Sequence, residues 1–232
     1  TDAPKDSNAL PTDMQVVGAV QRSANENTVA MCAAGTMPGE LHKLWKAGKP
    51  GSYHMEYGFS CMGYEIAGAM GIKMAQPEAD VICFTGDGTY MMANSEMATA
   101  AMMGVSFTVV VTDNRGFGCI NRLQMGTGGA EFNCMLDHAV GGENSNIDFA
   151  AHAAAMGATA RKVASIAELE EALARRHDVT GPYVVVIDTD PYPSTEHGGT
   201  WWEVGTPEVS DRAEVAEARA RYEANKATQR AD

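Results

Sequence analysis

Short apolar runs alternate with longer segments of helical periodicity along most of the chain. Strands are expected at residues 28–33, 80–85, 106–112, 159–163 and 183–188. Several of these runs are apolar almost throughout, which is typical of parallel strands covered on both faces. Helices are expected between them, at residues 14–25, 61–75, 94–103, 147–156 and 165–177. The alternation predicts an α/β fold, a three-layer, doubly wound and mostly parallel sheet of five or six strands.

The best-marked helix is the one expected at residues 165–177. Ser165 and Glu168 have the spacing of a capping box, in which each side chain accepts a backbone N–H of the first turn. Ile166, Leu169 and Leu173 then form one apolar stripe. We therefore expect this helix to begin at Ser165 and to pack that stripe on the sheet.

The two ends of the chain differ from its centre. Residues 1–12 are polar, contain two prolines and are predicted to be a linker. The main domain is expected at residues 13–192. The remaining residues, 193–232, hold a loop rich in glycine and tryptophan and then a C-terminal helix rich in Ala, Glu and Arg.

Composition and charge exclude several classes of protein. The chain has 17 basic and 30 acidic residues, a formal net charge of −13, so we expect neither nucleic acid nor an anionic membrane as a partner. No apolar run reaches the roughly 18 residues that a membrane span needs. Five cysteines without a CxxC pair are typical of reduced thiols in a cytoplasmic protein.

Polar residues that suit a metal and a phosphate follow two of the predicted strands. Asp87 and Asn114 lie just beyond strands joined by one helix, and a right-handed crossover brings those strand ends to the same edge of the sheet. A carboxylate and an amide oxygen suit Mg²⁺. Gly86 and Gly88 would let backbone N–H groups approach a phosphate. Alone, Gly-Asp-Gly is a common turn; the pairing with Asn114 is more specific.

This pairing resembles a known family signature. Gly86-Asp87-Gly88, 24 residues and then Asp113-Asn114 is similar to the motif of thiamine diphosphate-dependent enzymes, in their C-terminal diphosphate-binding domain. The resemblance covers about residues 14–191. It implies thiamine diphosphate and Mg²⁺ as cofactors, with the metal held by Asp87, Asn114 and the carbonyl of Gly116.

The same resemblance implies the remaining cofactor contacts. Met62 matches the apolar residue that wedges between the two cofactor rings, although packing in the core would also explain one of 15 methionines. The implied cofactor-binding residues are Thr36, Met37, Ser60, Cys61, Met62, Gly86, Asp87, Gly88, Thr89, Asn114, Gly116 and Cys119.

Two runs, residues 113–121 and 194–205, resemble one branch of this family more closely. Its members hydrolyse a C–C bond of a small polyhydroxylated cyclic 1,2-diketone in inositol catabolism. Decarboxylase-type members carry an acidic residue where this chain has Ile120, which argues against that branch.

Several polar and aromatic residues near these runs have two possible roles. They could contact the substrate or serve structure alone, and the sequence leaves the choice open. These residues are Arg115, Glu196, His197, Trp201 and Trp202.

The resemblance also implies a missing catalytic group. Enzymes of this family take a glutamate from a different, pyrimidine-binding domain, and Glu56, Glu65 and Glu131 match that position poorly. We therefore assign no catalytic residue here and expect that domain on another chain or in an upstream segment, within a homo-oligomeric enzyme. The chain by itself is expected to be inactive. Two alternatives stay open: another thiamine diphosphate lyase, such as an acetolactate synthase-like enzyme or a split-chain decarboxylase subunit, or a binding module without turnover.

Overall fold

The sheet has the predicted α/β architecture. A computed structural model describes residues 2–4, 6, 9–56, 58–142, 145–195 and 205–229. Its strands are β1 (Thr28–Cys32), β2 (Tyr53–Met55), β3 (Asp80–Gly86), β4 (Thr108–Asp113), β5 (Thr159–Val163) and β6 (Tyr183–Asp188). In the described residues they form one six-stranded sheet in the order β2-β1-β3-β4-β6-β5. Every neighbouring pair is parallel, so the predicted doubly wound sheet is confirmed.

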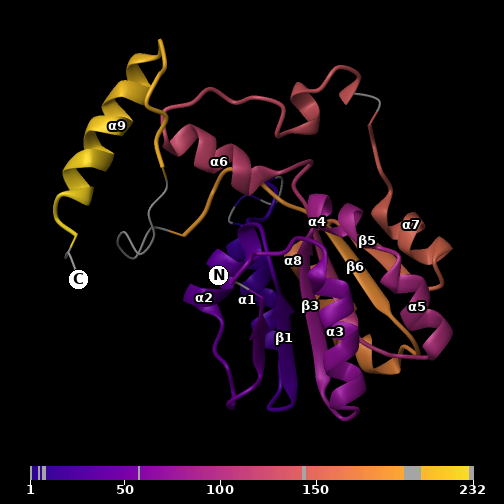
Figure 1. Cartoon of the computed structure of the whole chain (residues 1–232). Helices are drawn as coiled ribbons and strands as arrows, with labels where there is room; N and C mark the ends of the chain where they lie inside the picture. Colours follow the sequence, from indigo (N-terminus) through magenta and orange to yellow (C-terminus); the bar gives the residue numbers. More distant parts are fainter. Residues whose placement is uncertain are drawn as a thin grey trace.

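Helices cover both faces of this sheet (Figure 1). One face carries α1 (Asp13–Ser23), α2 (Thr36–Leu44) and α8 (Ile166–Ala174), and the other carries α3 (Tyr64–Ala75), α5 (Glu96–Met103) and α7 (Phe149–Ala155). Strand β3 shows how the sequence builds two cores. Ile82 and Phe84 point into the first layer, and Val81 and Cys83 point into the second, because successive side chains alternate along a strand.

The sequence did not predict β2, α2, α4 (Asp87–Met92), α6 (Gly118–Gly126) or the 3₁₀ turn at Leu136–His138. Each is short, so its hydrophobic period is poorly defined. The segment after β3 is also divided differently from the prediction. Instead of one helix from residue 94, α4 begins directly at Asp87, and α5 follows it from Glu96.

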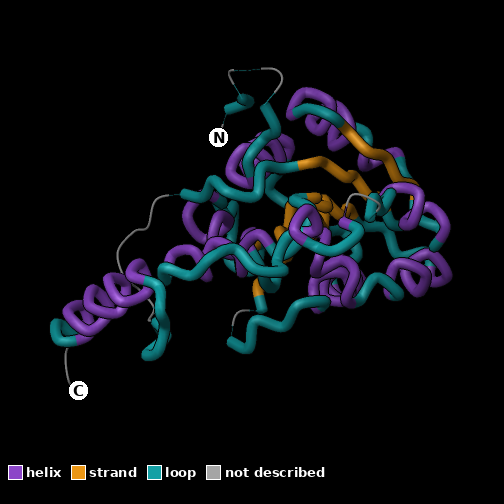
Figure 2. The backbone as a smooth tube through the Cα atoms, turned by 90° about the horizontal axis from the view of Figure 1, so that it is seen from above, coloured by secondary structure: helices purple, strands orange, loops and turns teal. Residues whose placement is uncertain are grey.

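The C-terminal helix α9 (Ala213–Lys226) lies apart from the helices that flank the sheet (Figure 2). Its residues Val215 and Ala218 are buried, and its first turn lies against the loop after α6. There Arg212 Nε donates to the carbonyl of Gly128 over 3.1 Å. None of the helices in the described ranges is both long and apolar enough to span a membrane.

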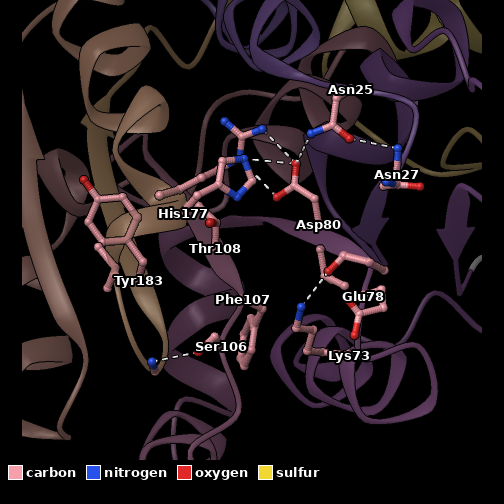
Figure 3. A pocket seen from close by; sticks show the side chains of 15 residues that line it. Asn25, Asn27, Lys73, Glu78, Asp80, Ser106, Phe107, Thr108, His177 and Tyr183 are labelled. Carbon is pink, nitrogen blue, oxygen red and sulfur yellow. Dashed lines mark hydrogen bonds and ion pairs between the residues drawn. The ribbon is translucent and has the colours of Figure 1, made fainter.

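A cavity of about 360 Å³ lies at the amino ends of the strands (Figure 3). Beside it, the buried Arg176 guanidinium donates to the Asp80 carboxylate over 2.7 Å and to the carbonyls of Ser23 and Leu173 over 2.8 Å. Burial opposes ionisation of Asp80, but hydrogen bonds from Arg176 and Thr28 outweigh it and lower the pKa of that carboxyl. This cavity edge is therefore held by a buried ion pair that joins α1, α8 and the sheet.

Replacing Arg176 by alanine should lower the free energy of unfolding by about 3–5 kcal/mol, because it leaves the Asp80 carboxylate buried without its partner. Urea unfolding measures the loss. The matched control is Arg175→Ala, since the neighbouring Arg175 makes an exposed pair with Glu171 and should cost about 0.5 kcal/mol or less. Equal losses in the two variants would contradict a special role of the buried pair.

Candidate functional site

Three loops meet at the carboxyl edge of the sheet, opposite the cavity. They follow β1, β3 and β4 and lead into α2, α4 and α6 at this edge (Figure 1). The second is the tight turn in which β3 ends at Gly86 and α4 begins at Asp87. A Cβ added to Gly35 would lie 4.0 Å from Thr89 Oγ1, so the first two loops are in contact distance. The strand order reverses between β1 and β3, and ligands of open α/β sheets bind at such a point.

Two buried oxygens without a partner mark the centre of this edge. Asp87 Oδ2 accepts the N–H of Gly116 over 2.7 Å, which joins the loops after β3 and β4. Asp87 Oδ1 and Asn114 Oδ1 are buried and accept no hydrogen bond from the described residues. Buried polar atoms are normally satisfied, so these two point to a ligand. A carboxylate and an amide oxygen fit a hard cation such as Mg²⁺.

The electrostatics of the edge also favour a cation. Burial raises the pKa of Asp87 to about 7, and the nearby Asp113 carboxyl adds to the rise. Burial raises the pKa of Asp113 too, although the N–H of Arg115 donates to it over 3.0 Å. In the described ranges no three His, Cys, Asp or Glu side chains gather to hold a metal. A cation here would therefore depend on Asp87, amide and carbonyl oxygens, and its ligand.

The loop after β4 is fixed from outside by the segment that follows α6. The N–H of Phe117 donates to the carbonyl of Cys134 over 2.8 Å, and that of Leu136 donates to the carbonyl of Arg115 over 2.9 Å. Gly116 has φ 146°, and a Cβ there would collide with the Cys134 carbonyl oxygen. Only glycine fits this position, so the Gly116 backbone is held next to Asp87.

The two glycines around Asp87 differ in their surroundings. A Cβ at Gly86 would meet no atom within 4 Å, so space is open beside that backbone. A Cβ at Gly88 would lie 2.6 Å from the Phe117 ring. Packing of the Phe117 ring therefore explains the need for glycine at position 88. The space beside the Gly86 backbone is open, as expected if a phosphate approaches it there. Thr89 is buried at the same edge.

The residues expected near the cofactor rings lie at the start of α2, just after the loop that follows β1, and in the turn before α3. Met37 is buried in the core, and Thr36 Oγ1 accepts a hydrogen bond from Arg122 over 2.8 Å. Met62 is half-buried in the turn before α3, with Ser60 and Cys61 exposed beside it. Met62 is therefore not enclosed in the core.

The remaining predicted residues have varied surroundings. Cys119 is half-buried in the first turn of α6, where burial raises the pKa of its thiol. The Arg115 guanidinium donates to Asp137 over 3.0 Å, which gives it a structural partner. Ile120 is about half-exposed. Glu196, His197, Trp201 and Trp202 lie outside the described residues.

Sequence reasoning did not single out Arg122, and it considered Glu65 only as a poor match to the glutamate of the pyrimidine-binding domain. Arg122 joins Thr36 to the carbonyl of Pro191, and Glu65 is buried under the turn that carries Met62. Neither stands in a motif, and their partners lie far away in the sequence. No spacing rule could have found them.

Asp13, the first residue of α1, is buried beside Arg122. Burial raises the pKa of its carboxyl to about 6, although the Arg122 guanidinium opposes the rise. The folded chain therefore holds this proton more tightly than the unfolded chain, whose aspartate pKa is about 3.9. This contribution to stability is complete below about pH 4 and is lost as the pH rises through 6.

Asp13→Asn should remove that pH dependence. The difference in unfolding free energy, variant minus wild type, should grow by up to about 3 kcal/mol between pH 4 and pH 7 and stay constant above. Urea unfolding of both proteins at several pH values gives this difference. A difference that is the same at pH 4.5 and pH 7.5 would show that Asp13 does not titrate in this range.

Comparison with solved structures supports the fold. The chain superimposes on a thiamine diphosphate-dependent 4-hydroxybenzoylformate decarboxylase of Rhodococcus jostii with a TM-score of 0.70, covering 84% of this chain and 35% of that one at 17% identity. Benzoylformate decarboxylase from Polynucleobacter necessarius gives a TM-score of 0.71 at 16% identity, over 82% and 35%. At these identities the likeness concerns the fold alone.

Curated relatives are more similar in sequence. The chain is 40% identical over 213 residues to 3D-(3,5/4)-trihydroxycyclohexane-1,2-dione hydrolases of Bacillus cereus and Bacillus thuringiensis. The match covers 89% of this chain and 33% of each relative, so the chain spans about a third of their length.

A family model completes the comparison. Residues 33–187 match the description "Thiamine pyrophosphate enzyme, C-terminal TPP binding domain". This range contains the three loops, Asp87 and Asn114. The chain therefore belongs to the thiamine pyrophosphate enzyme family and carries its C-terminal cofactor-binding domain.

Proposed function

We propose that this chain is the diphosphate-binding part of a thiamine diphosphate- and Mg²⁺-dependent hydrolase. The reaction is cleavage of a C–C bond in trihydroxycyclohexane-1,2-dione to give 5-deoxy-glucuronate, a step of myo-inositol catabolism. The observation that carries the proposal is the 40% identity, across 89% of the chain, with relatives named for this dione hydrolysis. The enzyme would be a cytoplasmic homo-oligomer whose pyrimidine-binding domain lies in another part of the protein or on another chain.

The loops after β3 and β4 would hold the metal and the diphosphate. Asp87 and Asn114 would use their unpartnered buried oxygens, and Gly116 its carbonyl, as metal ligands. Asp87 would contribute the negative charge among these ligands. Open space beside Gly86 would admit a phosphate, and the Thr89 hydroxyl would donate to it. Metal and backbone dipoles would thus balance the diphosphate charge.

The loops after β1 and before α3 would orient the two rings. Met62 would separate them and fix their relative angle, and the backbone at Thr36 and Met37 would bind the aminopyrimidine. When bound, thiamine diphosphate supplies a carbon nucleophile and an electron sink for C–C cleavage. This chain would hold the two cofactor rings in one relative orientation and exclude others. That restriction would lower the entropic cost of reaching the reactive arrangement of cofactor and substrate.

Product analysis with the full-length protein tests this function. With Mg²⁺ and thiamine diphosphate, the cyclic diketone should be converted to 5-deoxy-glucuronate, and pyruvate and benzoylformate should react far more slowly. Carbon dioxide or acetolactate from the keto acids, with no ring opening, would favour the alternative lyase. Failure to bind thiamine diphosphate in any assembly state would favour a chain without cofactor chemistry.

A further inference from the structure

One buried carboxylate joins the two loops that flank the expected ring-binding part of the site. Glu65 Oε1 accepts the N–H of Ala34 over 3.0 Å, and Glu65 Oε2 accepts the N–H of Gly63 over 2.9 Å. Ala34 lies just beyond β1, before Gly35 and Thr36, and Gly63 directly follows Met62. The Glu65 side chain is 1% exposed. A single side chain thus joins the Met62 turn to Ala34, which lies 31 residues before Glu65 in the sequence.

Helix capping alone does not explain this arrangement. Glu65 stands in the first turn of α3, where a carboxylate is stabilised by the helix dipole and by a nearby N–H such as that of Gly63. The second oxygen instead reaches Ala34, outside α3. Burial raises the pKa of Glu65, and the N–H bonds from Ala34 and Gly63 oppose the rise. Burying this carboxylate costs desolvation free energy, and the two N–H groups that it accepts offset part of that cost while linking the two loops.

The turn around Met62 is held on its other side as well. Glu56 accepts the N–H groups of Phe59 and Cys61 over 3.0 and 2.7 Å, so carboxylates bind the backbone both before and after Met62. The turn has a demanding backbone, with φ 51° at Ser60 and φ 94° at Gly63. Among the described residues the Glu56 carboxylate bonds only within this loop, while its backbone N–H donates to the Cys32 carbonyl of β1 over 3.3 Å. Of the two carboxylates, Glu65 is the one that ties the turn to β1.

We propose that Glu65 is a positioning residue that fixes the loop after β1 relative to the Met62 turn and so shapes the ring-binding half of the cofactor site. The inference rests on the proposed function, because it takes thiamine diphosphate as the ligand. The diphosphate half depends on Asp87 and Asn114, which Glu65 does not contact. Loss of Glu65 should therefore weaken binding of the rings and spare binding of a diphosphate.

The test is Glu65→Gln in the full-length protein, with two ligands measured by calorimetry in Mg²⁺. Glutamine keeps the size of the side chain, but its amide nitrogen cannot accept one of the two N–H groups. Affinity for thiamine diphosphate should fall about 10-fold, as for loss of an outer-shell partner, and affinity for inorganic pyrophosphate should stay within about twofold. In the ligand-free protein, amide hydrogen exchange at Ala34 or Gly63 should become faster.

Glu168→Gln is the matched control. Glu168 is also in the first turn of a helix and accepts the N–H of Ala164 over 2.9 Å, but it lies on α8, away from the loops. It should change neither affinity. If the glutamine variant does not fold, Glu65→Asp replaces it in the test. The shorter aspartate side chain cannot reach both loops, so affinity for thiamine diphosphate should again fall while affinity for pyrophosphate is kept.

If the Glu65 variants lose affinity for thiamine diphosphate and for pyrophosphate equally, or lose neither, the positioning role is overturned. The proposed function would still stand in that case, provided that the wild-type protein binds thiamine diphosphate. A wild-type protein that binds pyrophosphate but not thiamine diphosphate would instead refute the proposed function, and the inference with it.

Discussion

The purified 232-residue chain, given excess Mg²⁺ and thiamine diphosphate, should fold but not open the cyclic diketone at an enzymatic rate. Its strands and helices close two cores without further chain, so circular dichroism should show a cooperative α/β domain. Family resemblance implies that a glutamate from the pyrimidine-binding domain is needed. Within the described residues, Glu65 is committed to two backbone N–H groups and Glu56 to two others.

The expected deficit is large. Loss of general acid–base catalysis costs about 10²–10⁴-fold, and a site with one wall open to water adds to it. The measurement is ring opening by the purified chain, with the full-length protein as the positive control. Turnover near an ordinary enzymatic value of about 10 s⁻¹ would show that this chain supplies the missing group itself.

Asp87→Ala in the full-length protein should abolish Mg²⁺-dependent binding of thiamine diphosphate. It removes the charged protein ligand of the proposed metal and the carboxylate that holds the Gly116 N–H. Loss of an outer-shell partner already costs 10- to 100-fold in metal affinity, so a direct ligand should cost at least about 100-fold. The fold should survive, because burial makes this carboxylate costly in the absence of a cation.

Calorimetric titration with thiamine diphosphate, with Mg²⁺ and with a chelator, measures this effect. Asp188→Ala is the matched control, since Asp188 pairs in register with Asp113 at the same sheet edge but is half-exposed and bonded to Lys162. The control should bind the cofactor like wild type. Wild-type affinity in Asp87→Ala would refute the metal assignment.

Local sequence patterns were sufficient for the frame of this domain. All five predicted strands are present. Four of them are apolar runs buried on both faces, whereas β5 is a half-exposed strand at the edge of the sheet. The α8 cap was also predictable, since Ser165 and Glu168 interact across three residues, and the Ser165 hydroxyl accepts the Glu168 N–H over 3.2 Å. Asp87 and Asn114 could be brought together because both directly follow parallel strands.

Contacts between distant parts of the chain were decided by tertiary structure alone. The short strand β2 forms by pairing in parallel with the outer edge of β1. The start of α4 at Asp87 is set by the end of β3 at Gly86. No pattern in the sequence shows that Glu65 accepts a backbone N–H from the loop after β1, or that burial raises the pKa of Asp13. Backbone N–H groups carry no residue-specific signal, and burial exists only once the layers have packed. The elements of this protein were therefore determined locally, and the bonds that shape its site by the assembled fold.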